Sequence, residues 1–387
     1  MIEHPELDPT AERVAVVVAG AGARGAFEAG ALSVLLPWLD KQELRPTIFV
    51  GTSAGAINAT LLAATAQLPA EQAADKLLEL WRSLTIREVF RSPLRSGPRT
   101  LLTYVGQVLG RAHVVSLLDT TPLLSFAERA FAGFDSELRS NIDTGKVQAL
   151  ALVATDADER TAVFVDLPSA VAPPPPNLDR AIDYRPTRVG FRHVLASSAI
   201  PVLFRPIEID GAYYTDGGVR LNTPLAPALA LEATRVVVVA THPMSYPPAA
   251  APTPQIRPPD AVDSTAAILG SLLADRMVED LHTLDTFNEH TKGTTIRSVR
   301  RLFVGPSTRR ELGELAARLY AERHSGRRVI RELDFQLAHA LLGRAEKGDG
   351  DLLSYMLFDP VFIEEAIQLG ISHAHEALDS SPSPWRP

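Results

Sequence analysis

Two strand–turn–helix units near the N-terminus restrict the folds that are open to this chain. The first is an apolar run at 14–19, which breaks into glycines and continues as a helix with one apolar face. The second is a short apolar strand at 46–50, which ends in a glycine-rich turn and continues as a helix over 56–66. Successive units of this kind predict a parallel sheet covered by helices. We therefore expect an α/β fold, a three-layer sandwich with a mostly parallel central sheet.

The rest of the chain divides into further strands, an insertion and a C-terminal extension. Apolar runs predict strands at 148–155, 161–166, 235–240 and 301–304. Residues 70–145 have a helical pattern and predict a helical insertion, while the Pro- and Ala-rich stretch 244–260 predicts a loop. We expect one core domain at 10–243 and a mostly helical C-terminal region at 261–380 that packs on it.

The composition excludes several classes of protein. A formal net charge of −8 argues against a general nucleic-acid binder and against broad attraction to anionic membranes. The absence of cysteine removes disulfides, thiolate metal sites and a cysteine nucleophile. The N-terminus lacks the features of a secretory signal, and no apolar run approaches the roughly 18 residues of a spanning helix. We expect a cytoplasmic protein whose contact with membranes, if any, is local and peripheral.

The loop after the first strand is built to hold negative charge, because free N–H groups at the start of a helix point the same way. Gly20, Gly22 and Gly25 fit the pattern G-x-G-x-x-G. Two anions are candidates: the pyrophosphate of a dinucleotide, and an oxyanion that forms only during a reaction.

The end of the second strand favours the oxyanion. A dinucleotide site needs an acidic residue at this place, but the chain has Ser53 in the pattern G-x-S-x-G, flanked by the small or short residues Gly51, Thr52, Ala54 and Gly55. A serine on a sharp turn between a strand and a helix is lifted out of the sheet as a nucleophile.

A serine nucleophile needs a base, and two residues are candidates. His242 follows the strand at 235–240 and is the histidine best placed for a triad, although a capping or loop role suits it better. Asp216 lies between Tyr213, Tyr214 and two glycines, and an apolar surrounding raises the proton affinity of a carboxylate. His373 and His375, near the C-terminus, suggest a solvated helix end rather than a metal site.

Together these blocks resemble the patatin-like phospholipase family of lipid acyl hydrolases. The resemblance covers roughly 12 to 243, with weaker similarity at 352–370, and also includes Ala196 to Pro201 and Asn222-Thr223-Pro224. It implies a Ser53/Asp216 dyad without histidine, no metal and no cofactor. It assigns the oxyanion loop to Gly20, Ala21, Gly22, Ala23, Arg24 and Gly25, with backbone donors around Gly22, Ala23 and Arg24.

One residue of the loop departs from the family pattern, and one has two interpretations. Ala21 stands where the family usually has glycine, which is harmless if its φ is negative. Arg24 either fixes the oxyanion loop or is an ordinary surface arginine.

The expected function is a phospholipase A-like acyl hydrolase that acts on a lipid or another acyl ester. The alternatives are a catalytically silent module that binds lipid or protein, and a dinucleotide-binding enzyme. The apolar stripe at 101–109 is either core or a substrate wall, and the arginines at 87, 91, 95 and 99 form either a solvated face or a headgroup site. The oligomeric state stays open.

Overall fold

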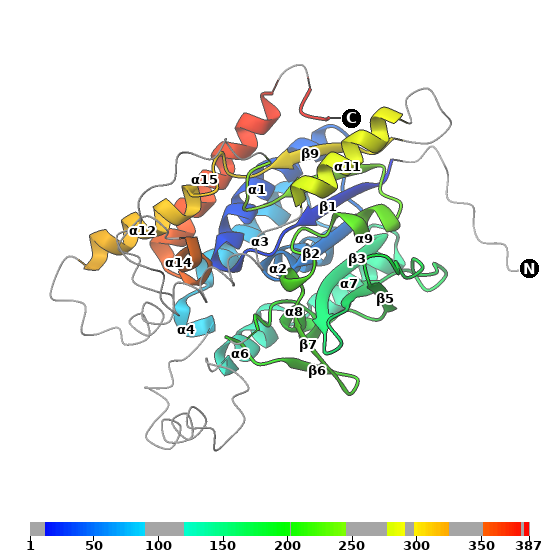
Figure 1. The fold of residues 1–387 in the computed structure, drawn as a ribbon, viewed down its shortest axis with the longest axis horizontal. Helices are drawn as coiled ribbons and strands as arrows, with labels where there is room; N and C mark the ends of the chain where they lie inside the picture. The colour runs from blue at the N-terminus through cyan, green and yellow to red at the C-terminus, as the bar shows by residue number, and fades with distance from the viewer. Residues whose placement is uncertain are drawn as a thin grey trace, which may run out of the picture.

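A mixed β-sheet is the centre of the part of the chain that the computed structural model describes, namely residues 12–89, 120–201, 203–244, 277–290, 298–324, 351–380 and 383–386 (Figure 1). Its main path has the order β5-β4-β3-β2-β1-β8-β9. The strands of this path are β1 (Val14–Val18), β2 (Ile48–Thr52), β3 (Ala149–Asp156), β4 (Thr161–Asp166), β5 (Ile182–Pro186), β8 (Arg235–Val239) and β9 (Arg300–Val304). The adjacent strands β3, β2, β1, β8 and β9 run parallel to one another, whereas β4 is antiparallel to β3.

Helices cover both faces of the sheet, because the central strands are apolar on both faces. In β1, Val14, Val16 and Val18 face one core, and Ala15 and Val17 face the other. The helices packed against the first core include α1 (Gly25–Lys41), α2 (Ala54–Ala64), α3 (Ala70–Ser83) and α15 (Pro360–Leu378); those of the second core are α9 (Leu225–Ala230) and α11 (Met277–His290). The predicted α/β sandwich with a mostly parallel sheet is confirmed.

The C-terminal region joins the core in two ways. β9 pairs in parallel with β8 and so extends the central sheet. α15 lies along α1, as the red and blue helices of Figure 1 show. It follows α14 (Asp351–Met356) after a break at Asp359-Pro360, where the Asp359 carboxylate accepts a hydrogen bond of 2.9 Å from the N–H of Val361. α14 and α15 are therefore separate helices, joined at Asp359-Pro360.

Parts of two predicted segments lie outside the described residues. The described helices of the predicted insertion are α3, α4 (Ile86–Val89), α6 (Thr121–Ala130) and α7 (Phe134–Asp143). Residues 90–119, which carry the apolar stripe and three of the four arginines, are not among the described residues, and neither are 245–276, which include most of the predicted loop. None of the described helices combines the length and the apolar character needed to cross a membrane.

Candidate active site

The strand β3 brings two distant segments to adjacent positions. One edge of β3 pairs with β4. The other edge pairs with β2, and this pairing ends at Thr52, which lies opposite Val153. The next residue of β3, Ala154, lies opposite Asp216 at the end of β7 (Ala212–Asp216). Because Ala154 also pairs with β4, β7 must occupy the β2 side of β3. The turn after β2, which begins with Ser53, therefore meets the end of β7.

Ser53 occupies a strained turn between β2 and α2. Its backbone has φ 55° and ψ −125°, which costs a non-glycine residue roughly 1–3 kcal/mol. The glycines on either side permit this turn: an ideal Cβ on Gly51 would lie 2.2 Å from the Gly55 carbonyl oxygen, and one on Gly55 would lie 2.3 Å from the Val18 carbonyl oxygen. Thr52, just before the turn, donates from its Oγ1 to the Leu221 carbonyl at 3.0 Å. The backbone therefore makes a sharp turn between strand and helix at Ser53.

Two serines of the helix α8 (Phe191–Ser197) and its cap hold this turn in place. Ser197 Oγ accepts a hydrogen bond from the Ser53 N–H at 2.9 Å and donates one to the Val153 carbonyl at 2.6 Å. Ser198 Oγ donates to the Ser53 carbonyl at 3.0 Å. These side chains replace the sheet hydrogen bonds that are lost where β2 leaves β3. The residues around Ser197 carry only a family resemblance in the sequence, and no local pattern there predicts this role.

Asp216 is a buried carboxylate that faces the Ser53 hydroxyl. Its side chain is 1% exposed, and its Oδ1 accepts a hydrogen bond of 2.7 Å from the Gly218 N–H. Burial raises the pKa of Asp216 to about 6, although the Ser53 hydroxyl and the Gly218 N–H both act to lower it. Oδ2 is buried and has no hydrogen bond of standard geometry within the described residues. A carboxylate with a raised pKa and an unoccupied oxygen is suited to accept a proton.

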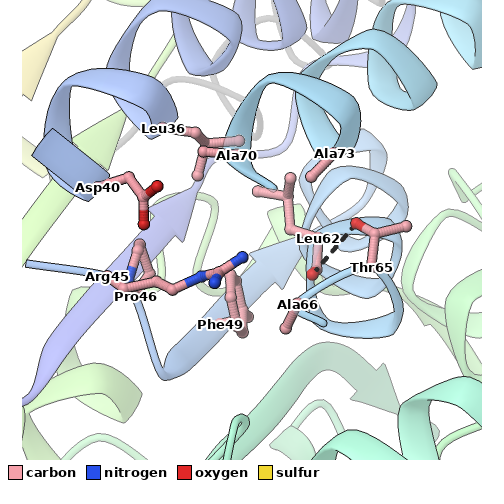
Figure 2. A pocket seen from close by; sticks show the side chains of 10 residues that line it. All are labelled: Leu36, Asp40, Arg45, Pro46, Phe49, Leu62, Thr65, Ala66, Ala70 and Ala73. Atoms are coloured by element: carbon pink, nitrogen blue, oxygen red, sulfur yellow. Dashed lines mark hydrogen bonds between the residues drawn. The ribbon is translucent and has the colours of Figure 1, made fainter. Parts of the chain in front are cut away.

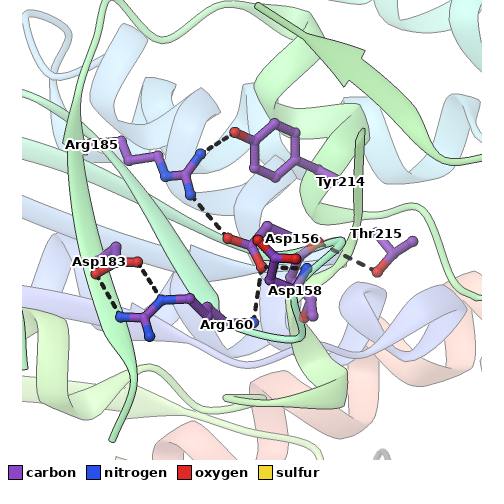
Figure 3. Close-up of polar contacts among 8 residues, drawn as sticks. Asp156, Asp158, Arg160, Asp183, Arg185, Tyr214 and Thr215 are labelled. Atoms are coloured by element: carbon purple, nitrogen blue, oxygen red, sulfur yellow. Dashed lines mark hydrogen bonds and ion pairs between the residues drawn. The ribbon is translucent and has the colours of Figure 1, made fainter. Parts of the chain in front are cut away.

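The strand β7 is fixed by a polar cluster on its buried face (Figure 3). Arg185 of β5 donates to the Tyr214 hydroxyl and forms an ion pair of 2.9 Å with Asp156 at the end of β3. Tyr214 is buried, and it lies on the same face of β7 as Asp216 because the two are two residues apart. Tyr213 points to the other face and is 56% exposed. The expectation that both tyrosines surround Asp216 was therefore wrong for Tyr213.

The glycine loop lies directly against the elbow. The Gly20 N–H donates a hydrogen bond of 2.9 Å to the Asn222 carbonyl. An ideal Cβ on Gly20 would lie 2.2 Å from Asn222 Oδ1 and 3.2 Å from Ser53 Cβ, so only glycine fits between them. Both polar atoms of the buried Asn222 side chain lack a hydrogen-bond partner among the described residues. Asn222 was noted from the sequence only as part of the family resemblance, and its place beside the candidate nucleophile depends on the tertiary fold.

In the glycine loop at 20–25, only some backbone N–H groups are free to donate a hydrogen bond to a ligand. Ala21 has φ −144°, so its methyl group, which departs from the family pattern, is tolerated. Gly22 has φ +53°, a left-handed conformation that favours glycine. The Arg24 N–H donates to the Ala21 carbonyl at 3.1 Å, and the Gly25 N–H also bonds within the loop. Arg24 is therefore not a backbone donor for an oxyanion. The amides of Ala21, Gly22 and Ala23 have no acceptor among the described residues.

The side chain of Arg24 is fully buried. Its guanidinium contacts Ser354 and Tyr355 of α14, so the interpretation as an ordinary surface arginine was wrong. The alternative, in which Arg24 fixes the loop, remains.

His242, His193 and His373 are partly or fully buried, each in a different part of the fold. His242 is buried beyond the end of β8 and is not among the groups that shift the pKa of Asp216. His193 accepts a hydrogen bond of 3.1 Å at Nδ1 from the Gly190 N–H at the start of α8. His373 is 7% exposed and lies 3.0 Å from Glu311, so the solvated end expected there was wrong for this residue. Within the described residues, no cluster of acidic and histidine side chains could hold a metal ion.

The candidate site is largely buried. Ser53 is 4% exposed and Asp216 1%, and neither residue lines either of two cavities found among the described residues. One cavity, of about 30 Å³, lies near the start of β2 beside Pro46 and Phe49, at the opposite end of that strand from Ser53 (Figure 2). The other, of about 490 Å³, lies between α3 and α6.

Comparison with known proteins identifies the family. The model for patatin-like phospholipases matches residues 16–229, which is more than half of the chain and includes Ser53 and Asp216. Similar solved structures include VipD from Legionella pneumophila, 13% identical over 94% of this chain and 67% of that chain with a TM-score of 0.33. Human GIVD cytosolic phospholipase A2 is 19% identical over 38% of this chain and 20% of that chain, with a TM-score of 0.23. No curated protein matches the chain. From the family match, the chain belongs to the patatin-like phospholipases.

Proposed function

We propose that this protein is a lipid acyl hydrolase that cleaves carboxylic esters with a Ser53/Asp216 dyad. The observation that carries the proposal is the pairing of a strained, hydroxyl-bearing elbow with a buried carboxylate whose pKa is raised to about 6. At neutral pH such a carboxylate is mostly ionised and still has a useful affinity for a proton. The family supplies the expectation of a lipid substrate.

In the proposed first half-reaction, Ser53 Oγ attacks the ester carbonyl carbon while Asp216 accepts the hydroxyl proton. The carbonyl oxygen becomes an oxyanion, which the free amides of Ala21, Gly22 and Ala23 stabilise by roughly 3–4 kcal/mol per donor. The C–O bond to the alcohol then breaks, and Asp216 returns the proton to the leaving alkoxide. The products are an acyl-enzyme at Ser53 and a free alcohol.

In the second half-reaction, Asp216 takes a proton from water, and the resulting hydroxide attacks the acyl carbon. The bond to Ser53 Oγ breaks, Asp216 returns the proton to that oxygen, and a carboxylic acid leaves. No histidine, metal or cofactor takes part in this sequence.

The test is hydrolysis of nitrophenyl acyl esters and of a panel of phospholipids and neutral lipids, with mass detection of the released fatty acid. Ser53→Ala should abolish turnover and labelling by a fluorophosphonate probe, because no other group supplies the nucleophile. Ser83→Ala is the matched control, since Ser83 is exposed on α3 and its hydroxyl only bonds to the Leu80 carbonyl. Undiminished turnover by Ser53→Ala would contradict the proposal. Lipid binding without labelling of the wild-type protein would instead indicate a catalytically silent module.

A further inference from the structure

The oxyanion loop rests on a helix that lies far outside the segment matched by the family model. That match ends at residue 229, whereas α14 spans Asp351–Met356. α14 packs against the short helix of the loop, η1 (Gly22–Arg24). An ideal Cβ on Gly22 would lie 2.4 Å from the Tyr355 carbonyl oxygen. The backbone of α14 therefore touches the loop at the residue whose positive φ shapes it.

The side chains of the same two segments make a second contact. Arg24 Nε donates a hydrogen bond of 2.6 Å to Ser354 Oγ. The Arg24 guanidinium also lies 4.1 Å from the centre of the Tyr355 ring, a cation–π distance. Arg24, Ser354 and Tyr355 are all buried, so water does not screen or replace these contacts. They hold Arg24 and the adjoining turn in one position.

The helix after α14 fixes the position of this contact. α15 crosses α1 at two glycines, because an ideal Cβ on Gly370 would lie 1.9 Å from the Phe27 carbonyl oxygen and one on Gly30 would lie 2.1 Å from the Ile367 carbonyl oxygen. α1 begins at Gly25, directly after the loop. The C-terminal region thus contacts the loop through α14 and the following helix through α15.

We propose that Tyr355, with Ser354, is a positioning residue for the oxyanion loop, so that the catalytic unit includes the C-terminal helices. This inference rests on the proposed hydrolase function. Tyr355 acts through Arg24 and Gly22 and does not touch the substrate. Its ring and backbone keep the amides of Ala21, Gly22 and Ala23 aimed at one point, and loss of that aim weakens stabilisation of the transition state more than substrate binding.

The test compares Tyr355→Ala, Tyr355→Phe and Ser354→Ala with wild type. Tyr355→Ala should lower kcat at least tenfold and slow fluorophosphonate labelling, while KM changes less than twofold. Tyr355→Phe keeps the ring over Arg24 and should restore most of kcat, and Ser354→Ala should give an intermediate loss. Glu364→Ala is the control: it breaks an exposed ion pair between α15 and Arg82 of α3, which makes no contact with Arg24, Ser354 or Tyr355 among the described residues, and should leave kcat unchanged.

A second measurement does not depend on activity. Amide hydrogen exchange at 20–25 should accelerate in Tyr355→Ala and stay slow in Tyr355→Phe and Glu364→Ala. Wild-type kcat together with unchanged exchange in Tyr355→Ala would overturn the inference while leaving the proposed hydrolase in place. If the wild-type protein neither hydrolyses esters nor reacts with the probe, the proposed function fails, and the exchange result alone decides whether Tyr355 holds the loop.

Discussion

Two carboxylates near the same corner of the sheet have opposite electrostatic surroundings. Asp183 of β5 receives two hydrogen bonds from Arg160, of 2.7 and 3.0 Å, and this arginine lowers the pKa of the carboxyl (Figure 3). Asp216 of β7 has no arginine or lysine among the causes of its shift, and burial raises its pKa to about 6. The Asp183 side chain is 27% exposed, whereas Asp216 is buried.

The two surroundings suit two different roles: Asp183 is suited to an ion pair that stabilises the fold, and Asp216 is suited to accept a proton. A cation beside Asp183 keeps it ionised and makes it a poor proton acceptor. A cation beside Asp216 would do the same there, yet Arg185 of this cluster is directed to Asp156 and Tyr214. Only burial and two neutral donors act on Asp216, and they leave it able to exchange a proton near neutral pH. Five predictions test this contrast.

The largest effect is expected from Asp216→Asn. The amide cannot take the proton from Ser53, and removal of a general base typically costs about 10²–10⁴-fold in rate. We expect kcat for nitrophenyl ester hydrolysis to fall by about 10³-fold, with the fold retained by circular dichroism. The same substitution at Asp183 serves as the control. Comparable losses in the two variants would mean that the carboxylates do not differ in role.

The pH dependence of the wild-type rate should follow the titration of Asp216. Only the ionised carboxylate accepts a proton, so kcat/KM should rise about tenfold per pH unit below a pKa of about 6 and level off above it. The measurement is a profile from pH 4 to 8 with an uncharged ester. A plateau that already begins at pH 4 would show that the carboxylate behaves like Asp183.

At neutral pH, Asp216 should lower the free energy of unfolding. Its pKa rises on folding from 3.8 to about 6, so the native state holds more protons than the unfolded state between these values. Stability is therefore lost as pH rises through this window, by about 3 kcal/mol in total. Asp216→Asn should gain this amount above pH 6 and nothing below pH 4, measured by urea unfolding. A gain that does not vary with pH would have another origin.

Arg185→Met should have a smaller effect on both stability and rate. It leaves Asp156 without its ion-pair partner and Tyr214 without its donor, which costs about 1–2 kcal/mol. Because β7 then loses one anchor, kcat should fall severalfold while the pKa seen in the rate profile stays near 6. A shift of that pKa by a full unit would show that Arg185 acts on Asp216 directly.

Asp183→Asn should have the smallest effect. The Arg160–Asp183 pair is partly exposed, and such pairs contribute about 0–1 kcal/mol. We expect the urea midpoint and kcat to stay within error of wild type. A large loss of either would remove the contrast between the two carboxylates.

The strands that sequence patterns predict are those with two buried faces. β1, β3, β4 and β8 consist largely of apolar residues, and the predicted bounds differ from the observed ones by at most one residue at each end. β5 and β7 were missed because their exposed and buried residues are mixed and their sequences carry charged or aromatic polar side chains. No strand was predicted around Asp216, and the pairing of Thr215 and Asp216 with β3 is what makes this segment a strand.

The residues of the candidate site likewise fall into those that the sequence could predict and those that it could not. Ser53 and Asp216 carry their chemistry in the side chain, so the sequence could nominate them, and the geometry gives both an environment that suits the proposal. The role of Ser197 and the burial of Arg24 depend on partners that lie 44 and 330 positions away in the chain, at Val153 and Ser354. Local patterns contain no information about such contacts.

The crossing of α1 and α15 has a consequence for how this protein can be shortened or recombined. At Gly30 and Gly370 the two main chains touch with no side chain between them. A fragment that stops where the family model stops would leave this face of α1 bare to water, and even a single added methyl group would wedge the helices apart. α1 and α15 are therefore tied to each other, and an exchange of one helix without the other would have to preserve this close contact.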